Sequence, residues 1–323
     1  LGDAFSFVQG GAVVDGHLLG GAAMTSSAAA STPRGAVWGA AGAVALTVSL
    51  WACAFPAIRA GLQAFSPGEL AALRFLIASA VLGLYVAVVR PPPPALRDLP
   101  RIGLAGALGI ASYNLLLNTG EQTVDAGTAS FIVNTAPVLT AMLGMMFLGE
   151  RLRVWGWAGI ALSLAGVWFI ASAGQNLHFG TGAPLILGAA LCQAAQFVLQ
   201  KPLLSRYGAV AVATWVIWSG TLLLLPFLPS ALSAAGHAAP TALAAVVFLG
   251  IGPAAIAYVA WAYALSQLPA GRAASFLYIV PPIATVIAFF WLGEAPQPSA
   301  LLGGLLALGG VVVVNTLGRR PRA

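Results

Sequence analysis

Residues 126–150, AGTASFIVNTAPVLTAMLGMMFLGE, recur 144 residues later as residues 270–294, AGRAASFLYIVPPIATVIAFFWLGE. Both stretches begin with Ala-Gly, carry a proline at the same place, Pro137 and Pro281, and end with Leu-Gly-Glu. The agreement continues without a gap into residues 159–167. Shared Ala, Gly and Leu are expected by chance in such a composition, but a proline and a Leu-Gly-Glu triplet at one unbroken offset are not. We therefore expect two copies of one structural unit.

The composition places these units in a membrane. Of the 323 residues, 60% are hydrophobic and only 7% are charged, whereas soluble domains carry roughly 25% charged residues. Such a chain cannot cover a surface that faces water. The formal net charge of +6 is small for this length, and it indicates membrane topology rather than nucleic-acid binding.

Apolar stretches separated by Pro and Gly define the expected spans. Residues 1–33 are rich in Gly, Ala and Ser and form a leader that we expect to be disordered. A span with its loop uses roughly 25 to 30 residues, so about ten fit in the remainder. Each is expected to be an α-helix, because lipid leaves no partner for an unpaired backbone group. The spans fall at residues 36–56, 67–89, 99–119, 124–147, 153–173, 181–201, 209–231, 240–266, 270–291 and 297–317.

The sequence thus predicts an all-α integral membrane protein of ten transmembrane helices arranged as two inverted five-helix repeats. The first repeat covers residues 34–175, the second covers residues 176–318, and a basic cytoplasmic tail follows at residues 319–323. Five is an odd number, so the second repeat enters the membrane upside down, with Glu150 facing the cytoplasm and Glu294 the exterior. Inverted repeats are typical of secondary transporters, whose substrate site lies near the midplane between the repeats.

The positions of Lys and Arg predict the orientation. With the N-terminus in the cytoplasm, 12 of the 14 basic residues fall at inner ends, while Arg59 lies at an outer end and Arg74 lies within the second span. Four acidic residues fall outside, at Glu69, Glu121, Asp125 and Glu294. The positive-inside rule therefore predicts an even number of spans, with both termini in the cytoplasm.

The repeated stretch, and Arg74 in Leu73-Arg74-Phe75 after Ser66-Pro67, resemble the drug/metabolite transporter superfamily in its EamA-like ten-helix branch. The resemblance covers residues 34–318. It implies a permease of the bacterial inner (plasma) membrane, and many members of that family are exporters of amino acids or related metabolites. One departure is that the residues after Glu294 lack the basic side chains that follow Glu150, which fits an exterior loop. The motifs identify the family but not the substrate.

Three glutamines mark one face of the sixth span. Gln193, Gln196 and Gln200 lie within about 60° of each other around a helix. They are candidates to line a cavity for a zwitterionic or hydroxylated solute. The alternative is that they hold neighbouring helices together by hydrogen bonds. Gln200 is the weakest candidate because it nears the inner end.

The third span carries an amide face that the second repeat replaces with an aromatic one. Asn114 and Asn118 are four residues apart, with Tyr113 adjacent, and the corresponding part of the second repeat contains Tyr258 and Trp261. Amides on one wall of a cavity and rings on the other suit an amphipathic metabolite. Ordinary aromatic packing or a membrane-interface belt remains the alternative for Tyr258 and Trp261.

Aromatic and amide residues elsewhere complete the candidate substrate site. Trp51 and Phe55 stand one helical turn apart in the first span, while Asn134 and Tyr278 occupy equivalent positions of the two repeats. Each of the latter two residues shortly precedes a mid-helix proline.

Pro137, Pro281 and Pro282 are candidate hinges. Proline removes a backbone hydrogen bond and bends a helix, exposing a carbonyl group that a solute can use. The doubled Pro281-Pro282 should bend its helix more strongly. Both a functional hinge and a static kink are consistent with the pattern.

Two charged residues near or within the spans need separate interpretations. Glu121 is the candidate carboxylate for proton coupling, although a solvated position at the outer rim, shared with Asp125, is the simpler expectation. Arg74 lies where a lone charge is costly. It is expected to snorkel outward or to pair with Glu294 or Glu69, in a structural role rather than in substrate binding.

Glycines in the fifth and tenth spans, at 156–166 and at 303–310, allow close helix packing. The packing can lie between the two repeats or between protomers, so both a monomer and a homodimer are compatible with the sequence.

Several classes of function are excluded. Cys53 and Cys192 lie in apolar runs as small hydrophobic residues, and the histidines lie outside the spans, so we expect no metal and no cofactor. The chain has neither an HExxH motif nor a Walker A motif, which excludes an intramembrane zinc protease and ATP hydrolysis. Phosphorylated substrates would require several intramembrane basic residues, and only Arg74 is present. The favoured function is a secondary transporter in the lipid bilayer that moves a small amphipathic metabolite such as an amino acid, and not an enzyme. The alternative is a non-transporting membrane assembly or flippase partner subunit.

Overall fold

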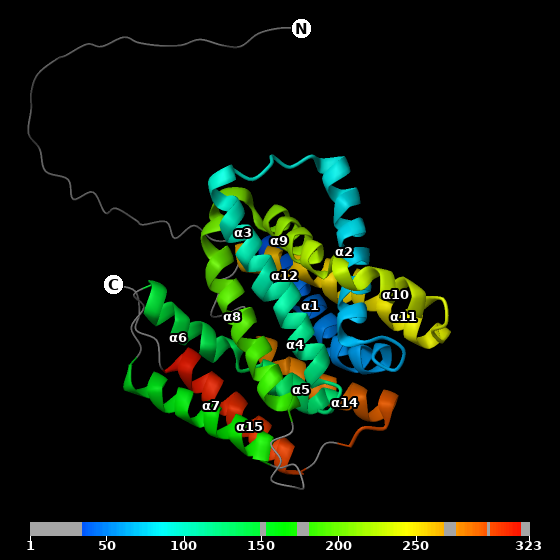
Figure 1. Cartoon of the computed structure of the whole chain (residues 1–323). Coiled ribbons are helices and arrows are strands. Elements are labelled where there is room, and N and C mark those ends of the chain that lie inside the picture. Colours follow the sequence, from blue (N-terminus) through cyan, green and yellow to red (C-terminus); the bar gives the residue numbers. More distant parts are fainter. Residues whose placement is uncertain (1–33, 149–152, 173–180, 268–275, 296–297, 318–323) are drawn as a thin grey trace, which may run out of the picture. The chain divides into compact units, whose positions relative to one another are not determined.

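The computed structural model describes residues 34–148, 153–172, 181–267, 276–295 and 298–317 (Figure 1). The expected leader at 1–33 and the expected tail at 319–323 lie outside these residues. The secondary structure of the described residues is entirely helical, as predicted. The α-helices are α1 (Arg34–Gly61), α2 (Pro67–Val89), α3 (Leu99–Gly106), α4 (Tyr113–Gly120), α5 (Ala126–Val133), α6 (Ala136–Leu148), α7 (Val154–Ser172), α8 (Gly182–Tyr207), α9 (Ala209–Leu224), α10 (Leu228–Ala235), α11 (Pro240–Leu249), α12 (Ala257–Gln267), α14 (Val280–Leu292) and α15 (Pro298–Thr316).

Several helix starts follow from local sequence. At the start of α2, the Ser66 hydroxyl accepts from the backbone N–H of Glu69, and the Glu69 carboxylate accepts from the backbone N–H of Ser66. Pro67 occupies the first turn, where its missing N–H costs nothing. At the start of α5, the Asp125 carboxylate accepts from the backbone N–H of Thr128 at 2.8 Å. Both starts fall close to the predicted ones.

The helices have the length and surface of a multi-pass membrane protein. Among the described residues, six helical segments are long and apolar enough to cross a bilayer. They are 41–61, 67–89, 96–120, 182–207, 209–235 and 240–264. Large apolar side chains such as Leu84, Val88 and Phe290 are exposed on the helix surfaces. A hydrocarbon phase, rather than water, is the solvent that suits such a surface.

Two helices contain π-helical segments at positions 143 to 144 residues apart. The segment η2 (Ala107–Ser112) joins α3 to α4, and η4 (Gly250–Ile256) joins α11 to α12. The sequence predicts an uninterrupted span at each place, and the chain does continue as a helix through both. A π segment shifts the backbone hydrogen bonds and frees carbonyl groups locally, and such segments are frequent at functional sites.

The fourth predicted span is broken rather than bent. Helix α5 ends at Val133, and α6 begins at Ala136, one residue before Pro137. In the second half, α14 begins at Val280, 144 residues after Ala136, and Pro281 lies in its first turn. Each proline therefore occupies the start of a helix, where its missing N–H is tolerated.

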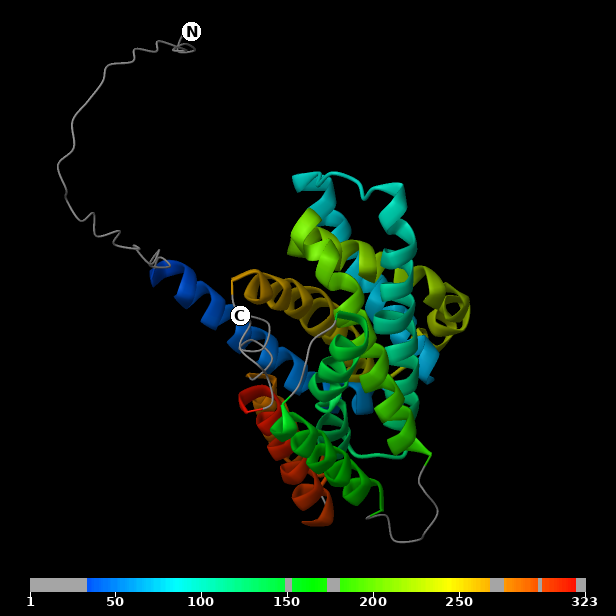
Figure 2. The same cartoon turned by 90° about the vertical axis from the view of Figure 1, so that its left-hand side faces the viewer.

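Helices α7 and α15 pack directly against each other, and they lie side by side in both views (Figures 1 and 2). A Cβ atom added to Gly166 would clash with the Gly303 carbonyl, and one added to Gly310 would clash with the Gly159 carbonyl. The sequence left open whether these glycines pack within the chain or between protomers. In this structure they pack within the chain.

Candidate functional site

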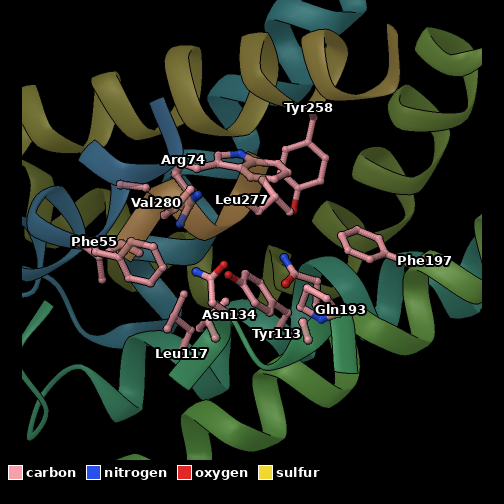
Figure 3. Close-up of a pocket in the computed structure, with 16 residues that line it drawn as sticks. Phe55, Arg74, Tyr113, Leu117, Asn134, Gln193, Phe197, Tyr258, Leu277 and Val280 are labelled. Atoms are coloured by element: carbon pink, nitrogen blue, oxygen red, sulfur yellow. The ribbon is translucent and has the colours of Figure 1, made fainter. Parts of the chain in front are cut away.

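A small cavity lies where α1, α2, α4, α5, α8 and α12 meet the starts of α6 and α14 (Figure 3). Its volume is about 60 Å³, which holds a few water molecules. Ligand sites typically enclose roughly 300–1,000 Å³, so these helices must separate before a metabolite can enter. The lining residues are Trp51, Ala54, Phe55, Ile58, Arg74, Tyr113, Leu117, Val133, Asn134, Ala136, Pro137, Gln193, Phe197, Tyr258, Leu277 and Val280.

Aromatic rings form one wall of the cavity. The ring of Trp51 meets Tyr258 edge to face, with centroids 5.7 Å apart and planes at 71°, and it lies 5.5 Å from Trp261. The Trp51 indole donates from Nε1 to the carbonyl of Pro253 at 3.2 Å. Because Pro253 lies inside the π segment η4, the irregular helix helps to fix this ring.

Amide groups lie on another wall. Asn134 is the residue at which α5 ends, and its Nδ2 donates to the Ser130 carbonyl at 2.9 Å. The Asn134 side chain therefore keeps its carbonyl oxygen as a hydrogen-bond acceptor. Pro137 has no N–H, so the cavity-lining Val133 loses its usual helical donor. Gln193 of α8 adds a second amide, and Figure 3 shows both amides pointing into the cavity.

Arg74 points into the same cavity from α2 (Figure 3). Its side chain is only 5% exposed, and its guanidinium carbon lies 5.0 Å from the centroid of the Phe75 ring. The structure shows neither of the expected arrangements of Arg74, an ion pair with Glu294 or Glu69 or snorkelling to water. Glu294 pairs with Arg59, and Glu69 is used in the capping box of α2.

A second, smaller cavity of about 20 Å³ adjoins the first and shares Trp51, Gln193, Phe197 and Tyr258 with it. It adds three sequence-predicted residues, which are Gln196, Gln200 and Trp261. Gln196 is 2% exposed and packs against Gly109, where any Cβ atom would clash with the glutamine side chain. The indole Nε1 of Trp261 is buried without a hydrogen-bond partner among the described residues. All three predicted glutamines thus reach one or both cavities.

The family follows from comparison with known proteins. The model of the "EamA-like transporter family" matches residues 37–172 and again residues 180–316. The chain belongs to the EamA-like transporter family. The resemblance noted in the sequence is therefore confirmed. The chain is a multi-pass transporter of the inner membrane, and it is not an enzyme.

Some relatives of this EamA-like transporter carry names that refer to export, and others are named as transporters without a stated substrate. It is 43% identical over 290 residues to a "Probable terminal-alkyne amino-acid exporter" of Streptantibioticus cattleyicolor, covering 89% of this chain and 96% of that protein. It is 29% identical over 288 residues to a "Probable amino-acid metabolite efflux pump" of Escherichia coli, covering 86% and 94%. A protein of known crystal structure matches with a TM-score of 0.58 and 21% identity, covering 86% of this chain and 96% of that one. That likeness concerns the fold alone.

Two predicted site residues of this EamA-like transporter lie away from both cavities. Asn114 is fully buried, and its Nδ2 donates to the Ile110 carbonyl at 2.7 Å, inside the π segment η2. Asn118 is also fully buried, and it donates to the Pro67 carbonyl at 3.0 Å, which ties α4 to the start of α2. The helical spacing correctly placed both amides on one face, but that face packs against protein. Tyr113, beside them, does line the first cavity.

Glu121 is not a solvated rim residue. It follows the last residue of α4 and is fully buried, and neither carboxylate oxygen has a hydrogen-bond partner among the described residues. Burial raises the pKa of this carboxyl well above its usual range, and the neighbouring Arg59 acts in the opposite direction. Asp125, expected beside it at the rim, caps α5 instead.

The other predicted positions of the transporter divide as follows. Phe55 and Pro137 line the first cavity, Pro281 is buried, and Pro282 is exposed. The side chain of Tyr278 lies outside the described part of the structure.

Sequence reasoning missed two polar clusters. In the first, the guanidinium of Arg59 donates to Glu294 and to the carbonyl of Glu121, which joins α1, the turn after α4 and the end of α14. In the second, Asp98 accepts from Arg206 at 2.8 Å and from the Tyr207 hydroxyl at 2.6 Å. The repeated Leu-Gly-Glu that contains Glu294 was the available signal for the first cluster.

Proposed function

We propose that this EamA-like protein is a secondary transporter that exports a small amphipathic metabolite, such as an amino acid, by alternating access. The moving parts are two inverted five-helix repeats, residues 34–175 and 176–318, with both termini in the cytoplasm. The substrate sits in the cavity between them. The observation that carries the proposal is that residues of both repeats line this one cavity, Trp51, Arg74 and Asn134 from the first and Gln193 and Tyr258 from the second.

Several features support the two-repeat architecture. The family model matches the chain twice, in ranges close to the proposed repeats. The π segments, the helix starts at Ala136 and Val280, and the bounds of α7 and α15 all recur at offsets of 143 to 144 residues. The contact of Gly166 with Gly303 also has a counterpart in the contact of Gly310 with Gly159. Reciprocal contacts of this kind are expected from a pseudo-two-fold axis.

The ten-helix count is part of this proposal. Besides the six long apolar segments, shorter apolar helices lie at Val154–Gly166, Val280–Leu292 and Leu301–Gly310. The broken pair α5 and α6 would supply one more crossing. Discontinuous helices near the midplane are a recurrent feature of secondary transporters.

The chemistry of the lining supports a zwitterionic solute with an apolar part. Rings on one wall offer apolar contact, while the amides of Asn134 and Gln193 offer hydrogen bonds. The relative from Streptantibioticus cattleyicolor is named for an amino acid with a terminal alkyne, a compact and apolar side chain. We extend the amino-acid class, and not that compound, to this protein.

The contracted cavity fits an occluded conformation, and the helix starts at Pro137 and Pro281 are the proposed hinges. Few backbone hydrogen bonds need to break there for the helices to swing apart.

Glu121 is the proposed proton-coupling residue, since it is a buried carboxylate beside Arg59 at one end of the bundle. We propose a monomer or a homodimer; because the glycine faces of α7 and α15 pack within the chain, a homodimer would use a different surface.

The test is counterflow in proteoliposomes that contain the purified chain, using a panel of amino acids and aromatic metabolites. We expect at least one neutral amino acid to exchange. Asn134→Ala and Gln193→Ala should each slow exchange several-fold, because each removes one hydrogen-bonding group from the cavity. Leu222→Ala is the control, since Leu222 is 65% exposed on α9. If the wild-type chain exchanges amino acids and all three variants match it, this cavity is not the substrate site. If no solute of the panel exchanges, the transport proposal fails.

A further inference from the structure

Arg74 is a buried cation that forms no ion pair with an acidic side chain in the described part of the structure. Its side chain is 5% exposed, and its Nε and Nη1 atoms are buried without a hydrogen-bond partner among the described residues. A guanidinium group has five N–H donors and no acceptor. Burying such a group unpaired in a low-dielectric interior is strongly unfavourable. The contact with the Phe75 ring satisfies none of these donors.

Of the described carboxylates that could neutralise Arg74, four are engaged elsewhere, and Glu121 acts on Arg74 only through space, without an ion pair or a hydrogen bond. Among the acidic side chains that the structure describes, Glu294 pairs with Arg59, Asp98 pairs with Arg206, Glu69 and Asp125 cap helices, and Glu121 makes no side-chain hydrogen bond. Long basic side chains at membrane helix ends usually snorkel to water. Arg74 instead reaches into the first cavity, from the side opposite Asn134 (Figure 3). Burial of the Arg74 charge is therefore unfavourable, and no ion pair among the described residues offsets it.

We propose that Arg74 binds the carboxylate of the transported solute, so that the substrate itself supplies the missing counter-charge. This inference rests on the proposed transport function and narrows the substrate to carboxylate-bearing compounds. An arginine fork can bind both carboxylate oxygens at once, which gives orientation as well as affinity.

Other residues of the cavity are suited to bind the ammonium group and the side chain of such a substrate. Asn134 uses its Nδ2 within α5, so its carbonyl oxygen remains to accept from an ammonium group. A donor at Arg74 and an acceptor at Asn134 match the two charges of an α-amino acid. The apolar side chain would lie against Trp51 and Tyr258, the wall with a T-shaped ring pair.

The experiment compares an amino acid that the wild-type transporter exchanges with its methyl ester and with the corresponding amine, which lacks the carboxylate. Proteoliposomes hold the full chain as wild type, Arg74→Gln or Arg74→Lys. Each variant is first checked by gel filtration and thermal unfolding in detergent. We expect the wild type to prefer the acid over the ester by at least about tenfold, because a buried donor left unpaired rejects the analogue. Arg74→Gln should lose this preference, while Arg74→Lys should keep part of it.

The outcomes separate the inference from the function on which it rests. Equal transport of acid and ester by the wild type, or an unchanged preference in Arg74→Gln, overturns the role of Arg74. If Arg74→Gln does not fold, Arg74→Lys decides instead. A reduced preference for the acid over the ester supports the inference and an unchanged preference overturns it, because a lysine lacks the fork that holds both oxygens. Transport of carboxylates without an amino group, with the same dependence on Arg74, supports the inference and refutes the amino-acid assignment. Transport of amines alone refutes both the role of Arg74 and the amino-acid assignment.

Discussion

Arg59 donates from Nε to Oε1 of Glu294 at 2.8 Å, across 235 residues of sequence. The other oxygen of Glu294 accepts from the backbone N–H of Ala126, at the start of α5, at 2.9 Å. Glu294 closes the second copy of the Leu-Gly-Glu motif, so the repeated sequence ends on a residue that joins the first half of the chain to the second. The pair is partly shielded, with side-chain exposures of 28% for Arg59 and 17% for Glu294.

Replacing this carboxylate should weaken the junction between the halves. Glu294→Gln keeps the shape of the side chain but removes its charge, and hydrogen bonds to charged groups contribute about 1.5–3 kcal/mol. We expect a lower midpoint of thermal unfolding in detergent. Glu69→Gln is the matched control, since glutamine also serves at this position of a capping box. Equal midpoints for the two variants would show that the Glu294 contacts do not contribute to stability.

The contact between α7 and α15 predicts opposite effects at adjacent glycines. A Cβ atom at Gly310 would clash with backbone atoms of Gly159 and Ser163, whereas at Gly309 the nearest atom is 4.0 Å away. Gly310→Ala should therefore destabilise the protein by about 1–3 kcal/mol through overpacking. Gly309→Ala should be neutral or stabilise it by up to about 1 kcal/mol, because alanine favours a helix. Thermal unfolding and membrane expression of the two variants test this. If Gly310→Ala behaves like Gly309→Ala, the helices do not pack as described.

A second pair of glycines tests the position of Gln196. A methyl group at Gly109 would occupy the space of the Gln196 side chain, whereas nothing lies within 4 Å of one at Gly103. Gly109→Ala should displace the glutamine and slow exchange several-fold, while Gly103→Ala in the neighbouring helix should not. Counterflow rates of the two variants, compared at equal protein content, test this prediction. Unchanged exchange by Gly109→Ala would remove Gln196 from the proposed site.

The helix positions could be predicted from the sequence, whereas many side-chain neighbours could not. Hydropathy and breakers placed α2 at its observed bounds and α7 within a residue of them. Periodicity also placed Asn114 and Asn118 on one face of their helix. It could not show that this face packs against protein, because the spacing of a stripe says nothing about which neighbour it meets.

Backbone irregularities were the least predictable features. Proline at position 137 signals a bend, but the full break between Val133 and Ala136 depends on how α5 and α6 pack. The π segments leave no mark in hydropathy. Arg74 was expected to snorkel outward or to form an ion pair, because sequence alone could not assign its two candidate partners, Glu69 and Glu294, to other contacts.

The buried carboxyl of Glu121 predicts a dependence on pH. Its native pKa is raised above the unfolded value, chiefly by burial. The nearby carboxylates of Glu294 and Asp125 raise this pKa further, whereas the positive charges of Arg59 and Arg74 lower it. The native state therefore holds this proton more tightly, so its contribution to stability is lost as pH rises through the raised pKa. Glu121→Gln should flatten the fall in thermal midpoint as pH rises above the ordinary range of a glutamate.

The same variant tests proton coupling. If Glu121 carries the coupled proton, Glu121→Gln should exchange substrate between equal pools but fail to concentrate it when a pH gradient is imposed. Gradient-driven accumulation by Glu121→Gln at the wild-type level would assign coupling to another group.

The measurement that tests the central claim most directly is the accessibility of the cavity from each side of the membrane. Gln193→Cys is made in a chain whose Cys53 and Cys192 are replaced by serine, and it is treated with a membrane-impermeant thiol reagent in vesicles of both orientations. Alternating access predicts labelling from either side and protection by a transported amino acid. Gln63→Cys, in the exposed turn after α1, should be labelled without such protection. Labelling of Gln193→Cys from one side only, with no protection by substrate, would contradict a cavity that opens to both faces in turn.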